Sequence, residues 1–219
     1  GSPYYTNGEN TEGRAWVFNG SAAGPSVNPT WIAESNQVDA RFGEVVSGAG
    51  DVNNDGYGDV IVAAPNHDAG QGGAYLYVGS LAGLETTPSW VTESEQDSAY
   101  FGRAVSSAGD IDGDGYGDVI ITGYEWDNGD SGHVYVYRGV PSPDFLSESP
   151  QWTIDAAQTG SDFGGSVAAA GDVNGDGFAD IIVGASNFTN DEVAEGKAYV
   201  YFGSVSGAST TADWSFESN

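Results

Sequence analysis

Short runs of apolar and aromatic residues alternate along the chain with segments rich in Gly, Asn, Asp, Ser and Pro. The runs are rich in Val, Ile, Tyr and Trp and are about four to eight residues long, which is typical of β-strands. No segment has a convincing 3.6-residue apolar period that would indicate a helix. Runs such as Val60–Val62 are apolar on consecutive residues, which suits strands buried on both faces. The pattern predicts an all-β protein made of stacked sheets.

The whole pattern repeats about every 60 residues. Each full unit starts with Phe-Gly and continues with an acidic loop, an apolar run, a Gly-bounded run with tyrosines and a Trp-centred segment. The Phe-Gly pairs begin at Phe42, Phe101 and Phe163. The Trp segments centre on Trp31, Trp90, Trp152 and Trp214. A repeat of this length with four strand-like runs is typical of a β-propeller blade.

We therefore expect about three and a half four-stranded antiparallel blades. Residues 1–35 form a partial blade with a third and a fourth strand, and residues 36–94, 95–156 and 157–219 form full blades. A sandwich of Greek keys would account for the strands but not for acidic loops at fixed intervals. Because closure removes exposed sheet edges, we expect an arc of a larger ring, or a piece that self-associates to complete the ring.

The three acidic loops share the pattern D-x-[DN]-x-D-G-x-x-D. Side-chain oxygens at positions 1, 3, 5 and 9, with the backbone carbonyl at position 7, can surround a hard cation. Gly at position 6 permits the sharp turn, and Ca²⁺ suits an all-oxygen site best. The bidentate Glu of an EF-hand is absent at position 12. The expected calcium ligands are Asp51, Asn53, Asp55, Tyr57 and Asp59; Asp110, Asp112, Asp114, Tyr116 and Asp118; and Asp172, Asn174, Asp176, Phe178 and Asp180.

The middle loop differs from its neighbours in carboxylate number. It has four Asp side chains at the ligand positions, whereas each outer loop has three and an Asn. Because affinity for Ca²⁺ depends partly on ligand charge, we expect the middle loop to be the tightest of the three sites.

The order of these motifs resembles the FG-GAP repeat, the family that includes the propeller heads of integrin α subunits. Phe-Gly, the acidic loop and a strand ending in Ala63-Ala64-Pro65 carry the resemblance, although the later units have Thr122-Gly123-Tyr124 and Gly184-Ala185-Ser186 instead. The resemblance implies a propeller, often seven-bladed, with calcium between the first and second strands of a blade. It also implies an extracellular, secreted or cell-surface setting and a role in adhesion or ligand binding.

Composition excludes several classes of partner. Asp and Glu number 32 against five Lys and Arg, for a formal net charge of −27. This charge argues against nucleic acid and anionic lipid as partners. No apolar run approaches the roughly 18 residues of a membrane span, so no membrane insertion is expected. The chain has no Cys, which rules out a disulfide framework and a cysteine nucleophile.

No catalytic motif accompanies the acidic loops. The chain lacks H-E-x-x-H, G-x-S-x-G and a phosphate loop, so we expect no enzyme activity. We expect the calcium to be structural and the ligand to be a protein or a glycan. Two alternatives stay open: a non-catalytic scaffold of a larger secreted hydrolase or lyase, and an excised or engineered fragment without activity of its own.

The recurring aromatic residues favour packing over binding. Tyr75 and Tyr77, like their counterparts in later units, alternate on a Gly-bounded strand and suit packing between blades better than a carbohydrate platform. We expect the Phe of each Phe-Gly pair to fill the space between blades, and each Trp to pack its outermost strand on its own blade.

Overall fold

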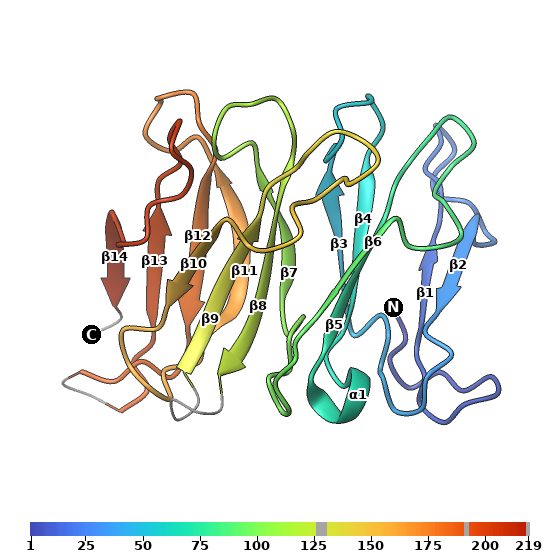
Figure 1. Ribbon diagram of the computed structural model, residues 1–219, viewed down its shortest axis with the longest axis horizontal. Helices are drawn as coiled ribbons and strands as arrows, with labels where there is room; N and C mark the ends of the chain where they lie inside the picture. Colours follow the sequence, from blue (N-terminus) through green and yellow to red (C-terminus); the bar gives the residue numbers. More distant parts are fainter. Residues whose placement is uncertain (126–130, 191–192, 218–219) are drawn as a thin grey trace.

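The computed structural model describes residues 1–125, 131–190 and 193–217 of the chain. Its strands form one two-stranded and three four-stranded sheets, all antiparallel, and within each sheet the strands follow chain order. In Figure 1 the sheets stand side by side in a row, from the N-terminal sheet on the right to the C-terminal sheet on the left. The fold is an all-β arc of three and a half propeller blades, as the repeat predicts.

The strand bounds define the four sheets. The first sheet pairs β1 (Arg14–Val17) with β2 (Trp31–Glu34). The second holds β3 (Val45–Gly50), β4 (Asp59–Ala64), β5 (Gly73–Tyr77) and β6 (Trp90–Glu93). The third holds β7 (Val105–Gly109), β8 (Asp118–Glu125), β9 (Ser131–Tyr137) and β10 (Trp152–Asp155). The fourth holds β11 (Phe163–Gly171), β12 (Asp180–Ala185), β13 (Lys197–Tyr201) and β14 (Trp214–Glu217).

A short turn, α1 (His67–Gly70), joins β4 to β5 and was not predicted from the sequence. Two of its residues have left-handed backbone angles, with φ of 43° at Asp68 and 59° at Ala69. These angles explain why the segment has no helical sequence signal: it is a tight, irregular turn rather than a regular helix.

The core consists of three clusters, and each lies between two neighbouring sheets. The central cluster takes Ile61 and Leu76 from the second sheet and Val119 and Ile121 from the third, all four fully buried. Similar clusters join the first sheet to the second and the third to the fourth. Burial on both faces explains why these strands are apolar on consecutive residues.

The Phe-Gly motif lies at these interfaces, as expected. Phe42, Phe101 and Phe163 are buried, and the main chain of Phe101 forms a parallel bridge with Gly72 of the preceding blade. A Cβ atom on Gly72 would lie 2.2 Å from the Phe101 carbonyl oxygen. The close approach of this main chain therefore explains the glycine before the third strand, and the Phe side chain fills the core between the blades.

The tryptophans also reach beyond their own blade, which the sequence did not predict. Trp31 clusters with Ala15 and Ala33 of its own sheet, and its ring lies edge-on to Tyr77 of the next blade at 4.7 Å between centroids, while its Nε1–H donates to the Glu85 carbonyl. Trp90 meets Tyr137 in the same way at 5.1 Å. The outermost strand is thus fixed by its neighbour, because indole needs both an apolar face and a hydrogen-bond acceptor.

Candidate functional site: the acidic loops

The three acidic loops connect the first and second strands of the three full sheets. They join β3 to β4, β7 to β8 and β11 to β12. In Figure 1 all three lie at the upper edge of the arc, whereas α1 lies at the lower edge. The repeat therefore gathers all 15 candidate ligand residues along one edge.

The Asp at position 1 organises the turn of each loop. In the middle loop, Asp110 accepts hydrogen bonds from the backbone N–H groups of Gly113, Asp114 and Gly115 at 2.8–3.0 Å. Asp51 and Asp172 accept equivalent bonds in the other loops. Gly115 has φ of 93°, which explains the glycine at position 6.

The Asp at position 9 is buried and ties the loop to the sheet. Asp118 accepts hydrogen bonds from the N–H of Ile111 at 2.8 Å and from the N–H of Gly139, beyond β9, at 2.9 Å. Burial raises the pKa of Asp118 to about 7, against the opposing effect of these two hydrogen bonds. Burial also raises the pKa of Asp59 above its usual value. These buried carboxylates lie where positive charge would stabilise their ionised form.

The middle loop brings three of its candidate ligands together. One carboxylate oxygen from each of Asp110, Asp112 and Asp118 lies within 4.8 Å of the others. In the outer loops the third position is Asn, and its amide donates to the Asp at position 5, from Asn53 to Asp55 at 2.9 Å and from Asn174 to Asp176 at 2.8 Å. The middle loop therefore has the densest negative charge of the three.

One basic residue in this site was missed in the sequence. The guanidinium of Arg138 lies 2.7 Å from Asp112 and 2.6 Å from Asp114. Aligning the repeats could have found it: Arg138 directly precedes Gly139, where the other full units have the apolar residues Val78 and Phe202. Arg138 thus offsets part of the extra charge of the middle loop.

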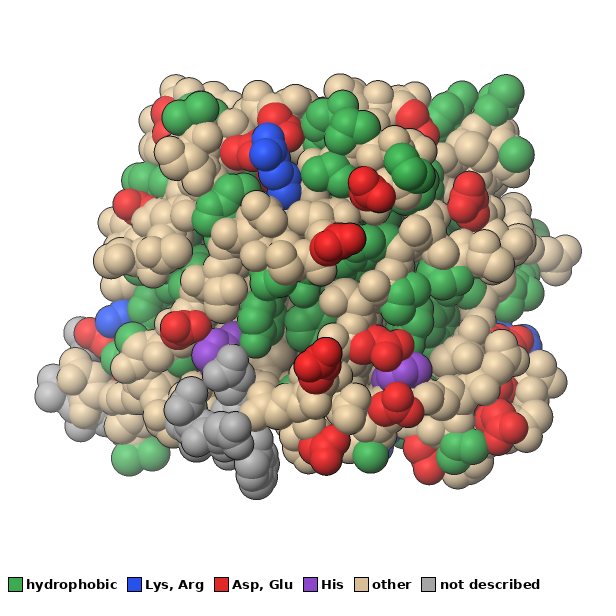
Figure 2. All heavy atoms as spheres, viewed as in Figure 1, with side chains coloured by type: hydrophobic (Ala, Val, Ile, Leu, Met, Phe, Trp, Pro, Cys, Tyr) green, Lys and Arg blue, Asp and Glu red, His purple; other side chains and the backbone are tan. Residues whose placement is uncertain are grey.

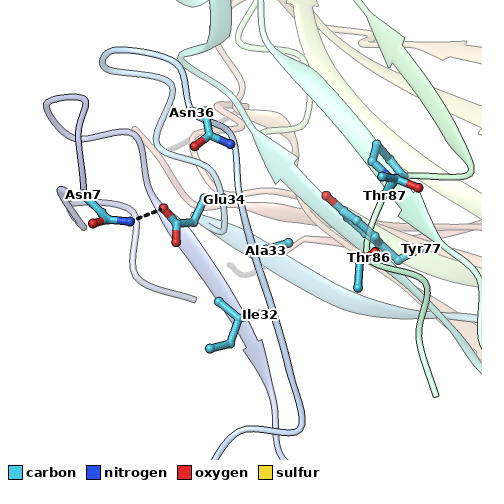
Figure 3. Close-up of a pocket in the computed structure, with 9 residues that line it drawn as sticks. Asn7, Ile32, Ala33, Glu34, Asn36, Tyr77, Thr86 and Thr87 are labelled. Carbon is cyan, nitrogen blue, oxygen red and sulfur yellow. Dashed lines mark hydrogen bonds between the residues drawn. The ribbon is translucent and has the colours of Figure 1, made fainter. Parts of the chain in front are cut away.

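A separate polar pocket of about 430 Å³ lies between the first and second sheets. Figure 3 shows Glu34 and Asn36 on one side and Thr86 and Thr87 on the other, with Asn7 donating to Glu34 at 3.2 Å. Its lining offers hydroxyl, amide and carboxylate groups, which suit a hydrogen-bonding ligand.

The stacked antiparallel sheets, each full one with an acidic loop between its first and second strands, define a β-propeller arc. An FG-GAP repeat model matches residues 163–201 and an FG-GAP-like repeat model matches residues 51–121. Together they cover half of the chain. The chain belongs to the FG-GAP repeat family.

Curated relatives agree with this assignment. The chain is 36% identical over 133 residues to integrin alpha-IIb of Mus musculus, covering 59% of the chain and 12% of the relative. It is 34% identical over 155 residues to integrin alpha-PS2 of Drosophila melanogaster, covering 64% and 11%. It is 28% identical over 208 residues to integrin alpha-5 of Xenopus laevis, covering 89% and 19%. The chain thus spans less than a fifth of the length of these relatives.

Among the helices of the described residues, none has the length and apolar character needed to cross a membrane.

Proposed function

We propose that the chain is a calcium-binding FG-GAP propeller segment that acts in extracellular adhesion or ligand binding, with three Ca²⁺ ions stabilising its blades. The proposed ligand sets are the five positions of each acidic loop given above. Residues 1–35, 36–94, 95–156 and 157–219 are the proposed repeat units.

The middle loop carries this proposal. Three carboxylate oxygens within 4.8 Å, one of them from the buried Asp118, repel one another unless a cation or protons intervene. A divalent ion relieves this repulsion and keeps Asp118 ionised at neutral pH. Oxygen donors alone suit Ca²⁺, which takes six to eight such ligands.

The backbone carbonyls at position 7 support the same assignment. Among the described residues, no backbone hydrogen bond is donated to the carbonyl oxygens of Tyr57, Tyr116 or Phe178. Each of these residues instead uses its N–H to bond the Asp at position 5, at 2.9–3.0 Å. A backbone carbonyl oxygen that accepts no backbone hydrogen bond and lies in a loop with several carboxylates is suited to bind a cation.

Adhesion or ligand binding is proposed from the resemblance to integrin α subunits. The ligand is a protein or a glycan, and the polar pocket between the first and second sheets is a candidate contact for it. Self-association to complete a ring is a further proposal, supported by Trp214, which is 50% exposed where Trp31 is 7% exposed. No catalytic role is proposed.

Chelation tests the calcium role. Melting should shift to lower temperature in EDTA and recover when Ca²⁺, but not an equal concentration of Mg²⁺, is added back, because a ligand that binds the native state stabilises it. An unchanged melting temperature would contradict the proposal. Binding to immobilised matrix proteins and glycans, with and without EDTA, tests the adhesion role separately.

A further inference from the structure

A second group of metal-ligating side chains lies at the edge of the arc opposite the acidic loops. It consists of His67 and Asp68 in α1 and Glu93 at the end of β6, and we call it the His67 cluster. One ligating atom from each residue lies within 4.8 Å of the other two. Figure 2 shows both histidines in the lower part of the molecule with acidic side chains beside them.

The imidazole of His67 is oriented by its surroundings. The Tyr75 hydroxyl lies 3.0 Å from Nδ1, and the His67 side chain is 13% exposed. The opposite nitrogen, Nε2, faces Glu93 Oε1 at 3.0 Å and Asp68 Oδ2 at 3.8 Å. In a metal-bound histidine the ring nitrogen that does not bind the metal is usually hydrogen-bonded, and this bond fixes the ring orientation. The Tyr75 hydroxyl is placed to do this at Nδ1 of His67, with Nε2 toward the two carboxylates.

Comparison between blades shows what is unusual here. The position on the third strand that pairs with the fourth-strand carboxylate holds a basic side chain in three sheets: Arg14 opposite Glu34, His133 opposite Asp155, and Lys197 opposite Glu217. In the second sheet this position is Gly73, opposite Glu93. In the first and last sheets an Arg or Lys side chain thus lies beside this carboxylate. In the second sheet His67, which comes from α1 rather than from the third strand, lies there instead.

A second carboxylate, that of Asp68, lies beside the His67 ring. Asp68 has a left-handed backbone, and its side chain lies beside the imidazole ring. The Gln37 amide donates a hydrogen bond to Asp68 Oδ1 at 2.7 Å. The other carboxylate oxygen, Oδ2, faces His67 Nε2. Two carboxylates therefore face one imidazole nitrogen, which gathers negative charge at one point. A divalent ion supplies the matching charge.

We propose that the His67 cluster binds a divalent transition metal of the Zn²⁺ type through His67 Nε2, Asp68 and Glu93. One nitrogen and two carboxylate ligands, with water in the fourth position, form an open zinc site. Ligands at about 2.0–2.1 Å from a tetrahedral ion lie about 3.3 Å apart, between the observed 3.0 and 3.8 Å. The nitrogen ligand favours Zn²⁺ over Ca²⁺, which prefers oxygen alone. The site is thus distinct in chemistry and position from the acidic loops.

Zinc titration of the whole chain in saturating Ca²⁺ tests the proposal, because the acidic loops are then filled. Calorimetry should show one Zn²⁺ per chain, and binding should weaken at least about tenfold in His67→Gln and Glu93→Gln and also in Tyr75→Phe, which frees Nδ1. Co²⁺ in place of Zn²⁺ should give visible absorption that His67→Gln removes. Circular dichroism should show that each variant keeps its β-sheet content.

Two matched variants serve as controls. Glu217→Gln changes the equivalent carboxylate beside Lys197, and His133→Gln changes the other histidine; both should bind Zn²⁺ like the parent chain. Absence of Zn²⁺ binding in saturating Ca²⁺ would overturn the proposal. Equal weakening by His133→Gln, or no weakening by His67→Gln, would overturn it as well.

Discussion

The backbone N–H of Gly117 donates a 2.8 Å hydrogen bond to the backbone carbonyl of Asp51, which joins the acidic loop of one blade to that of the next. Ala179 makes the equivalent bond to Asp110 at 3.0 Å. The last loop has no described neighbour beyond it, and its Val173 is 55% exposed where Val52 and Ile111 are fully buried. The conformation of each acidic loop therefore depends partly on its contacts with the neighbouring blade.

Substitution of Gly139 by Ala should strongly destabilise the chain. A Cβ atom there would lie 2.4 Å from the Gly117 carbonyl oxygen, and such overpacking costs about 1–3 kcal/mol. Gly20 is the equivalent residue of the partial blade, with no atom within 4 Å of its Cβ position, so Gly20→Ala should be nearly neutral. Urea unfolding in saturating Ca²⁺ measures both, and equal unfolding midpoints would contradict the packing argument.

The Asp at position 9 should contribute to the free energy of unfolding even when no metal is bound. Asp118→Asn leaves one buried N–H, of Ile111 or Gly139, without an acceptor, which costs about 1–3 kcal/mol. Asp112→Asn should be milder, because both outer loops have Asn at that position. The comparison is made by urea unfolding in EDTA, and an unchanged unfolding midpoint in Asp118→Asn would contradict the role of Asp118 as an acceptor of two backbone N–H groups.

The native Arg138 side chain should lower the calcium affinity of the middle loop, so replacing it should raise that affinity. Its guanidinium bonds Asp112 and Asp114, so Arg138→Gln removes a positive charge that repels Ca²⁺. We expect a several-fold tighter middle site by calorimetry. Arg103 pairs with Asp162 away from the loops, so Arg103→Gln should leave calcium affinity unchanged. An affinity that falls in Arg138→Gln would mean that the arginine instead orders the ligands.

The tryptophan positions should differ in their contribution to stability. Trp31→Ala removes a buried ring packed on Tyr77 and an indole hydrogen bond, with an expected loss of about 3–5 kcal/mol. Trp214→Ala removes a half-exposed ring that stacks on Phe216, so its loss should be below about 1 kcal/mol. Thermal or urea unfolding distinguishes the two, and similar losses would contradict the assignment of Trp31 to the contact between blades.

Much of the fold could be predicted because each blade repeats the same constraints. Phe101, the acidic loops and the doubly buried strands gave the sheet order and the interfaces between blades. The partner of each Trp could not be predicted, since the sequence shows a strand's own register but not which neighbouring blade its side chains reach.

The candidate site was only partly predictable. The spacing of the Asp residues identified the candidate ligands, but not the buried role of Asp118 as an acceptor of two backbone N–H groups. Arg138 and Asp112 are 26 positions apart, and their contact depends on how the third strand returns to the loop. His67 and Glu93 come together through an irregular turn with left-handed backbone angles, which no pattern of residues indicated.

Counting bound calcium tests the central proposal most directly. Calorimetry and native mass spectrometry of the whole chain should find three Ca²⁺ ions, one for each acidic loop. Asp51→Ala, Asp110→Ala and Asp172→Ala should each remove one ion, because each removes the carboxylate that organises its loop. A chain that binds no Ca²⁺, or that keeps three ions in all three variants, would contradict the proposal.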